Sequence, residues 1–91
     1  MIKTIFKYKF ANGDDTMQVD GNKVVLVTQQ DPDDTYPTVW IEHGENKENF
    51  ELAVYGTGHA IPPNYEHVGS AVCGTFVWHV YRMEALNVER P

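Results

Sequence analysis

The clearest pattern in this chain is a period-two alternation of side chains in short runs. In residues 2–10, one face of the alternating run carries Ile2, Thr4, Phe6, Tyr8 and Phe10. The opposite face carries Lys3, Ile5, Lys7 and Lys9. Alternation of this kind is typical of a β-strand with one buried face. Residues 2–10 are therefore predicted to form a half-buried strand.

The same reasoning predicts further strands at residues 16–19, 23–29, 36–43, 50–55, 65–72 and 75–82. Residues 23–29 are dense in β-branched side chains, so we expect that strand to be covered on both faces. Asn12-Gly13 and Gly21-Asn22 are residues that suit tight hairpin turns. Short strands joined by hairpins predict an all-β fold, an antiparallel sandwich or a small barrel. A curved sheet with one helical turn is the alternative.

Length and cysteine content limit the organisation further. Ninety-one residues suit a single domain. We place one β domain at residues 1–82 and a C-terminal tail at residues 83–91, in which a short helix and a frayed end both fit. Cys73 is the only cysteine, so no internal disulfide can form. With no signal peptide and no long apolar run, we expect an intracellular protein without a membrane span.

The charge balance narrows the classes of partner. Thirteen acidic residues against seven basic ones give a formal net charge of −6, which disfavours binding to double-stranded nucleic acid. The basic residues are unevenly placed, because Lys3, Lys7 and Lys9 all lie in the first nine positions. A local positive face on an acidic molecule is therefore compatible with the sequence.

Residues 55–63, Tyr-Gly-Thr-Gly-His-Ala-Ile-Pro-Pro, form the most distinctive segment. Glycines permit close backbone approach, and the two prolines stiffen the C-terminal end of the segment. Such a loop at a strand end can bind an anion through backbone N–H groups, aided by Thr57, His59 and a lysine from the first strand. The alternative is a tight connection whose glycines serve only the turn.

Catalytic and metal signatures are weak. The four histidines follow none of the usual metal-ligand spacings, so no metal and no cofactor are expected. A histidine-pair phosphoesterase would carry a hydroxyl two positions after each histidine, and only His79 has one, the phenol of Tyr81. Cys73 fits a small buried side chain better than a nucleophile. We therefore do not expect an enzyme.

Aromatic side chains suggest a binding surface. Tyr55, His79 and Tyr81 fall on the faces of their strands opposite to the predicted core residues. They could line a groove in which a purine stacks, with His59 near its phosphates. The alternative is that this second face packs against another sheet or a second protomer, and we expect a homo-oligomer.

Two motifs carry a family resemblance. The GTGHAIP loop at residues 56–62 and the FVWHVY strand at residues 76–81 resemble those of a family of short, uncharacterised proteins of tailed phages and prophages. The resemblance covers about residues 2–82. It implies a viral origin and the cytoplasm of an infected bacterium, and it implies no catalytic residue.

Taken together, these features favour a non-enzymatic binding protein that sequesters a host immune signalling nucleotide. The expected ligand-binding residues are Tyr55, Gly56, Thr57, Gly58, His59, His79 and Tyr81. One alternative is an acidic inhibitor that docks on a host defence nuclease or CRISPR effector through Asp31, Asp33, Asp34, Glu42, Glu45 and Glu48. Another is a minor virion or morphogenesis component.

Overall fold

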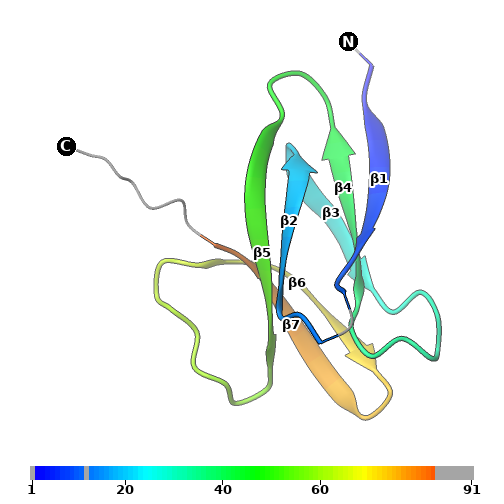
Figure 1. The fold of residues 1–91 in the computed structure, drawn as a ribbon, viewed down its shortest axis with the longest axis vertical. Coiled ribbons are helices and arrows are strands. Elements are labelled where there is room, and N and C mark those ends of the chain that lie inside the picture. Colours follow the sequence, from blue (N-terminus) through cyan, green and yellow to red (C-terminus); the bar gives the residue numbers. More distant parts are fainter. Residues whose placement is uncertain (1, 12, 84–91) are drawn as a thin grey trace.

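The computed structural model describes residues 2–11 and 13–83, and these form seven strands (Figure 1). The strands are β1 (Thr4–Lys9), β2 (Thr16–Gly21), β3 (Lys23–Thr28), β4 (Thr38–His43), β5 (Glu48–Gly56), β6 (Glu66–Cys73) and β7 (Phe76–Arg82). Every paired neighbour is antiparallel. The predicted all-β class is confirmed.

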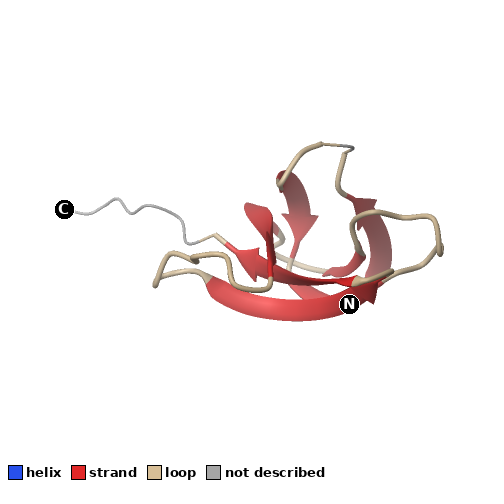
Figure 2. Cartoon of the chain, turned by 90° about the horizontal axis from the view of Figure 1, so that it is seen from below, coloured by secondary structure: helices blue, strands red, loops and turns tan. Residues whose placement is uncertain are grey.

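The strands form two sheets with the orders β1-β4-β3 and β2-β5-β7-β6. Figure 2 shows the strands and the loops that join them. Among these seven strands, consecutive ones pair only at β3–β4 and β6–β7. The predicted hairpin at Asn12-Gly13 is therefore wrong, because β1 pairs with β4 and β2 pairs with β5. Between β1 and β2 the chain passes from one sheet to the other, so that the apolar faces of both strands point into the space between the sheets.

Gly21 forms the corner at which the chain crosses back. Its φ is +150°, and a Cβ on it would collide with the Ile41 side chain and lie 3.1 Å from the Glu42 carbonyl oxygen. Only glycine fits this conformation and this space. The next amide N–H, of Asn22, donates to the Glu42 carbonyl at 2.8 Å. This turn too, expected as a hairpin, joins strands of different sheets.

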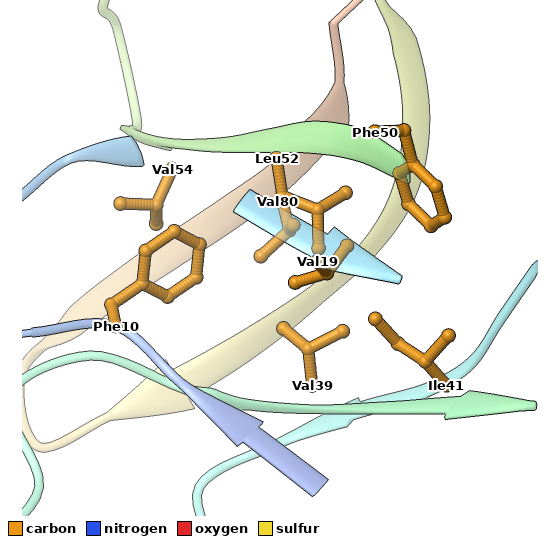
Figure 3. Close-up of a cluster of buried hydrophobic side chains, with 8 residues drawn as sticks. All are labelled: Phe10, Val19, Val39, Ile41, Phe50, Leu52, Val54 and Val80. Carbon is orange, nitrogen blue, oxygen red and sulfur yellow. The ribbon is translucent and has the colours of Figure 1, made fainter. Parts of the chain in front are cut away.

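The core lies between the two sheets (Figure 3). Its buried residues are Phe10, Val19, Val39, Ile41, Phe50, Leu52, Val54 and Val80. The alternate residues of β5 point inward together, as the sequence pattern predicts. Burying a side chain of this size stabilises the fold by about 1.5–3 kcal/mol relative to its exposure. These contacts fix the relative position of the two sheets.

The expectation that residues 23–29 form a strand covered on both faces is wrong. Val25 is 41% exposed and Leu26 is 50% exposed. The strand β3 lies at a sheet edge, pairs only with β4, and shifts register between Val24 and Leu26. Its β-branched composition therefore reflects strand propensity and not burial on both sides.

Cys73 is buried, which raises the pKa of its thiol. Across residues 2–11 and 13–83, no helix is long and apolar enough to cross a membrane. Of the predicted tail, residues 84–91 lie outside the described part of the chain. Met83 itself donates its backbone N–H to the Glu51 carbonyl at 2.9 Å.

Candidate functional site

The outward face of the four-stranded sheet carries a row of polar and aromatic side chains. In the register of this sheet, Tyr55 lies opposite His79, and His79 lies opposite Ser70. Two residues after His79 in the same strand, Tyr81 lies opposite His67. Side chains that face one another across neighbouring strands are within contact range. Three strands thus bring together groups that are distant in sequence.

Three of these groups, together with Thr57 just after β5, form a continuous hydrogen-bonded chain, which we call the histidine array: Thr57, His79, Ser70 and His67. The Oγ1 of Thr57 lies 3.1 Å from Nε2 of His79. The Oγ of Ser70 lies 2.8 Å from Nδ1 of His79 and 2.8 Å from Nε2 of His67. A hydroxyl has one proton, so Ser70 can donate to only one of the two rings and accepts from the other when that ring carries a proton.

Tyrosine rings border the histidine array. The centroid of the Tyr81 ring lies 5.1 Å from that of His67 and 5.9 Å from that of Tyr55, with the two tyrosines edge to face. Partial burial, followed by the nearby phenol of Tyr65, raises the pKa of Tyr55. Tyr55 is therefore a neutral phenol at physiological pH, available as a hydrogen-bond donor and as an apolar ring surface.

An irregularity in β6 makes the array possible. His67 and Ser70 are three residues apart, so a regular strand would place them on opposite faces. The register of β6 against β7 shifts between His67 and Gly69, which returns Ser70 to the face that His67 occupies. Gly69 points to the other sheet, where a Cβ would lie 2.8 Å from Cβ of Val27. Glycine is required at this close approach.

The loop after β5 has its own internal hydrogen bonds. The Gly56 N–H donates to Nδ1 of His59 at 3.2 Å, and the His59 N–H donates to the Gly56 carbonyl at 3.2 Å. Gly58 adopts a φ of +91°, which closes the turn. Two amides expected to bind an anion thus already have partners inside the loop, and Thr57 is the loop residue that joins the histidine array.

Shallow recesses flank this loop. One of about 390 Å³ is lined by Thr16, Tyr55, His59 and neighbouring residues, and another of about 290 Å³ is lined by Thr57, His59, Trp78 and others. A larger groove of about 530 Å³ lies at the far end of β5, between Glu51, Tyr65 and Arg82. Figure 1 shows the segment from β5 to β6 extending to one side of the sheet.

Comparison with known proteins gives one match. A family model described as a domain of unknown function (DUF7352) matches residues 1–91. The chain belongs to the DUF7352 family. No curated protein and no solved structure matches it. The chemistry of this DUF7352 chain must therefore be inferred from its own residues.

The DUF7352 structure brings some of the predicted site residues together and separates others. Thr57 contacts His79, and Tyr55 contacts Tyr81. His59 is not part of the array: its Nδ1 accepts from the Gly56 N–H, and its ring lies at Gly56 on the side of the sheet where Trp78 lies. Sequence reasoning missed His67 and Ser70, since simple alternation separates them. A valine followed directly by a glycine, Val68-Gly69, inside an otherwise alternating strand is the signal that indicates a bulge.

The lysines expected beside the loop lie elsewhere. Lys3, Lys7 and Lys9 project from the outward face of the three-stranded sheet, on the opposite side of the sandwich from the histidine array. Their contacts are with Glu42, Trp40 and Asp34, respectively. The expectation that one of them assists the glycine loop is therefore wrong, because β1 pairs with β4 and not with a strand of the other sheet.

The histidines of the array do not belong to a cluster of metal ligands. Within residues 2–11 and 13–83, no three or more histidine, cysteine, aspartate or glutamate side chains converge in a way that could hold a metal ion. The two histidines of the array instead share a hydroxyl. Their arrangement suits hydrogen bonding to an oxygen-rich ligand.

Proposed function

We propose that the histidine array and its bordering tyrosines bind a small phosphate-bearing nucleotide and hold it chemically unchanged. The observation that carries this proposal is the Thr57–His79–Ser70–His67 hydrogen-bonded chain, which lies beside Tyr55 and Tyr81. The protein would then act stoichiometrically, by sequestration.

The array has the hydrogen-bonding groups that a phosphate requires. Phosphoryl oxygens accept hydrogen bonds, and the array contributes two hydroxyls and two imidazoles. An imidazole in its protonated form donates from both nitrogens and adds a positive charge, which strengthens its hydrogen bond to an anion. A phosphate seated here would replace the bonds that these side chains now make to one another.

The neighbouring rings can hold the base. Tyr81 lies between Tyr55 and His67, so the three rings form a continuous aromatic border along the array. Stacking of a base on an aromatic side chain contributes about 1–3 kcal/mol. That contribution matters here, because a protein of net charge −6 attracts an anion poorly at long range. Short-range contacts must supply the affinity.

The surroundings of the His67 and His79 imidazoles favour binding of an unchanged nucleotide over its catalytic conversion. Within the described part of the chain, neither His67 nor His79 makes a hydrogen bond or ion pair to a carboxylate. A carboxylate commonly orients and supports a catalytic histidine. The array binds through groups that are oriented only by one another.

The resemblance of residues 56–62 and 76–81 to phage proteins supports a biological setting for this activity. We place the protein in the cytoplasm of an infected bacterium, where it would sequester an immune signalling nucleotide as a homo-oligomer. In cells that carry a nucleotide-triggered defence system, expression of the chain should restore phage growth. A failure to do so for every such system would remove this setting while leaving nucleotide binding intact.

Calorimetric titration with cyclic dinucleotides, cyclic trinucleotides and ADP-ribose derivatives tests the binding itself. We expect one ligand class to bind and to be recovered intact by mass spectrometry. His79→Ala should abolish binding, because it removes the centre of the array. His43→Gln is the matched control, since His43 bonds to Tyr8 in the other sheet. Equal loss in both variants, or no binding across the panel, would refute the proposal.

A second candidate function is phosphodiester cleavage, and one observation favours it. The ring centroids of His67 and His79 lie 6.4 Å apart with a hydroxyl bonded to both. Two imidazoles on either side of a phosphate can act as base and acid. In that case the recovered nucleotide would be cleaved, and either single alanine variant would bind it without cleavage.

The structure gives less support to an acidic inhibitor. Three of the six carboxylates that would form its phosphate-mimicking surface are ion-paired. Asp34 pairs with Lys9, Glu42 with Lys3, and Glu48 with Arg82, at 3.4, 3.5 and 2.9 Å. Paired carboxylates present less negative charge to a partner protein than the sequence alone indicates.

A further inference from the structure

The first strand leaves one edge of the three-stranded sheet open. In the order β1-β4-β3, the backbone of Thr4–Lys9 pairs with β4 on one side only. An edge strand of this kind presents a row of N–H and C=O groups to which another strand can bond. The side chains on β1 determine which strand that would be.

The outward side of this edge is basic. Six lysine and arginine residues occur in the described part of the chain, and four of them, Lys3, Lys7, Lys9 and Lys23, lie on the outward face of the three-stranded sheet. Among the described residues, only two carboxylates, Glu42 and Asp34, pair with them. The face is thus net positive on a molecule whose net charge is −6. It is electrostatically complementary to an acidic partner.

The inward side of the same edge is apolar and incompletely covered. Phe6 shares its face with Tyr8 and points towards the core side of the sheet, yet it is 52% exposed. Its ring centroid lies 4.7 Å from that of His43 in an edge-to-face arrangement, and none of the seven described strands lies on its other side. On the outward side Ile5, between Lys3 and Lys7, is 56% exposed. An additional strand would cover both side chains.

We propose that the free edge of β1 binds an extended acidic segment of a partner protein, which adds a fourth strand to the three-stranded sheet. Acidic side chains at alternate positions of the segment lie across from the lysines. The intervening positions carry apolar side chains that cover Phe6. Backbone hydrogen bonds supply affinity, and the alternation of acidic and apolar residues supplies specificity. This activity is separate from nucleotide binding, which uses the opposite face of the sandwich.

Charge excludes the simplest competing occupant, a second copy of β1. Two antiparallel β1 strands would set lysines against lysines, and like charges directly opposite one another destabilise a sheet. Edge lysines serve in many proteins to prevent self-pairing of this kind. Here they reject basic and purely apolar strands and accept an acidic one.

The aromatic content of the face argues against a single-stranded nucleic acid. Stacking platforms for bases need exposed rings in succession. Among the paired residues of β1, β4 and β3, the one aromatic residue on the outward face is Trp40, and Nζ of Lys7 lies over its ring at 5.6 Å from the centroid. An exposed isoleucine and an exposed leucine, Ile5 and Leu26, suit a peptide better than a base.

A labelled peptide of alternating Glu and Val, long enough to span Thr4–Lys9, tests the proposal by fluorescence anisotropy. The control peptide has the same composition with all Glu residues first and all Val residues last. We expect the alternating peptide to bind at least roughly tenfold more tightly than the control, because only it matches both sides of the edge. Equal affinities, or no binding of the alternating peptide, would overturn the proposal.

Three further measurements separate strand addition from charge attraction. N-methylation of alternate peptide amides should abolish binding while leaving every side chain in place, and peptide binding should slow hydrogen exchange at β1 amides. The variant Lys7→Glu/Lys9→Glu should lose binding while it keeps the β-sheet circular dichroism spectrum of the parent protein as evidence of its fold. Unaffected binding of the methylated peptide would overturn the strand model. So would tighter binding of a labelled single-stranded oligonucleotide, or self-association through β1 in sedimentation experiments.

Discussion

The two outward faces of this sandwich present contrasting surfaces. The four-stranded face presents imidazoles, hydroxyls and phenols that hydrogen-bond to one another, and it depends on an irregular strand, β6. The three-stranded face presents lysines whose placement follows the regular alternation of β1. The first surface is built by tertiary structure, and the second follows directly from the sequence. Mutations and salt should therefore affect the two faces differently.

Loss of the shared core should have the largest effect, because it supports both faces. Leu52 is fully buried between the sheets. Leu52→Ala should lower the free energy of unfolding by about 2–5 kcal/mol, the range for a large buried aliphatic side chain. Urea denaturation followed by tryptophan fluorescence measures this change. Val72→Ala, at a 62% exposed position, is the control and should change stability little.

Disruption of the β6 bulge should damage one face and spare the other. Gly69→Val would force a side chain into the space that Val27 fills, at a cost of about 1–3 kcal/mol. The shift of β6 should move Ser70 and His67 out of the array. We expect nucleotide binding to disappear while the acidic peptide still binds. Simultaneous retention of both activities would show that the bulge does not determine the array.

Salt should distinguish the two faces without any mutation. Exposed charge pairs weaken as ionic strength rises, because the Debye length falls from about 10 Å at 0.1 M to about 3 Å at 1 M. Peptide binding to the lysine face should weaken several-fold over this range. Nucleotide binding to the histidine array, which depends on hydrogen bonds and stacking, should weaken less. Anisotropy and calorimetry at matched salt concentrations measure the difference.

The smallest predicted effect is on the pH dependence of stability, and it involves Tyr36, a tyrosine that links the two sheets. The Tyr36 hydroxyl donates to Oδ1 of Asp15 at 3.0 Å, and its ring packs edge to face on Trp78 of β7. The bond to Asp15, followed by desolvation and nearby negative charge, raises the pKa of Tyr36 above 10.0. The folded state then keeps this proton at a pH where the unfolded state has lost it.

A group whose pKa is higher in the folded state than in the unfolded state stabilises the fold fully at pH values below its unfolded-state pKa. That stabilisation is lost as the pH rises through its folded-state pKa. The unfolding free energy should therefore decline above about pH 10, and it should decline less in Tyr36→Phe. Denaturation curves at neutral and alkaline pH measure the two slopes. Identical slopes would show that the bond to Asp15 contributes nothing to the folded state.

Much of the fold was predictable from alternation. The pattern in β5 identified Phe50, Leu52 and Val54 as core, and all three are buried. The pattern in β1 separated its lysines from Phe6 and Tyr8, as the register shows. The turn residues were recognised, but Gly13 and Gly21 join strands of different sheets. The residue composition of a turn indicates the local backbone conformation, but it does not indicate which sheet the next strand joins.

The candidate site was predictable in part. Thr57 was identified from the loop, and Tyr55, His79 and Tyr81 from the outward faces of β5 and β7; they are neighbours in space. His67 and Ser70 were missed, because a strict period of two assigns them to opposite faces. The orientation of His59 was equally hidden, since its bond to Gly56 depends on how the loop closes.

In the regular strands β1 and β5, the sequence by itself determined which side chains point inward, because the backbone pleat of a regular strand sets its two faces locally. It also determined that β1 would carry a basic face. Only the tertiary structure decided which strands pair, since backbone hydrogen bonds are the same for every residue and the choice among partners depends on packing the whole core. The close approach of Gly69 to Val27 and the shifted register of β6 arise from that packing. The histidine array therefore depends both on the local alternation of the strands and on the packing of the whole core.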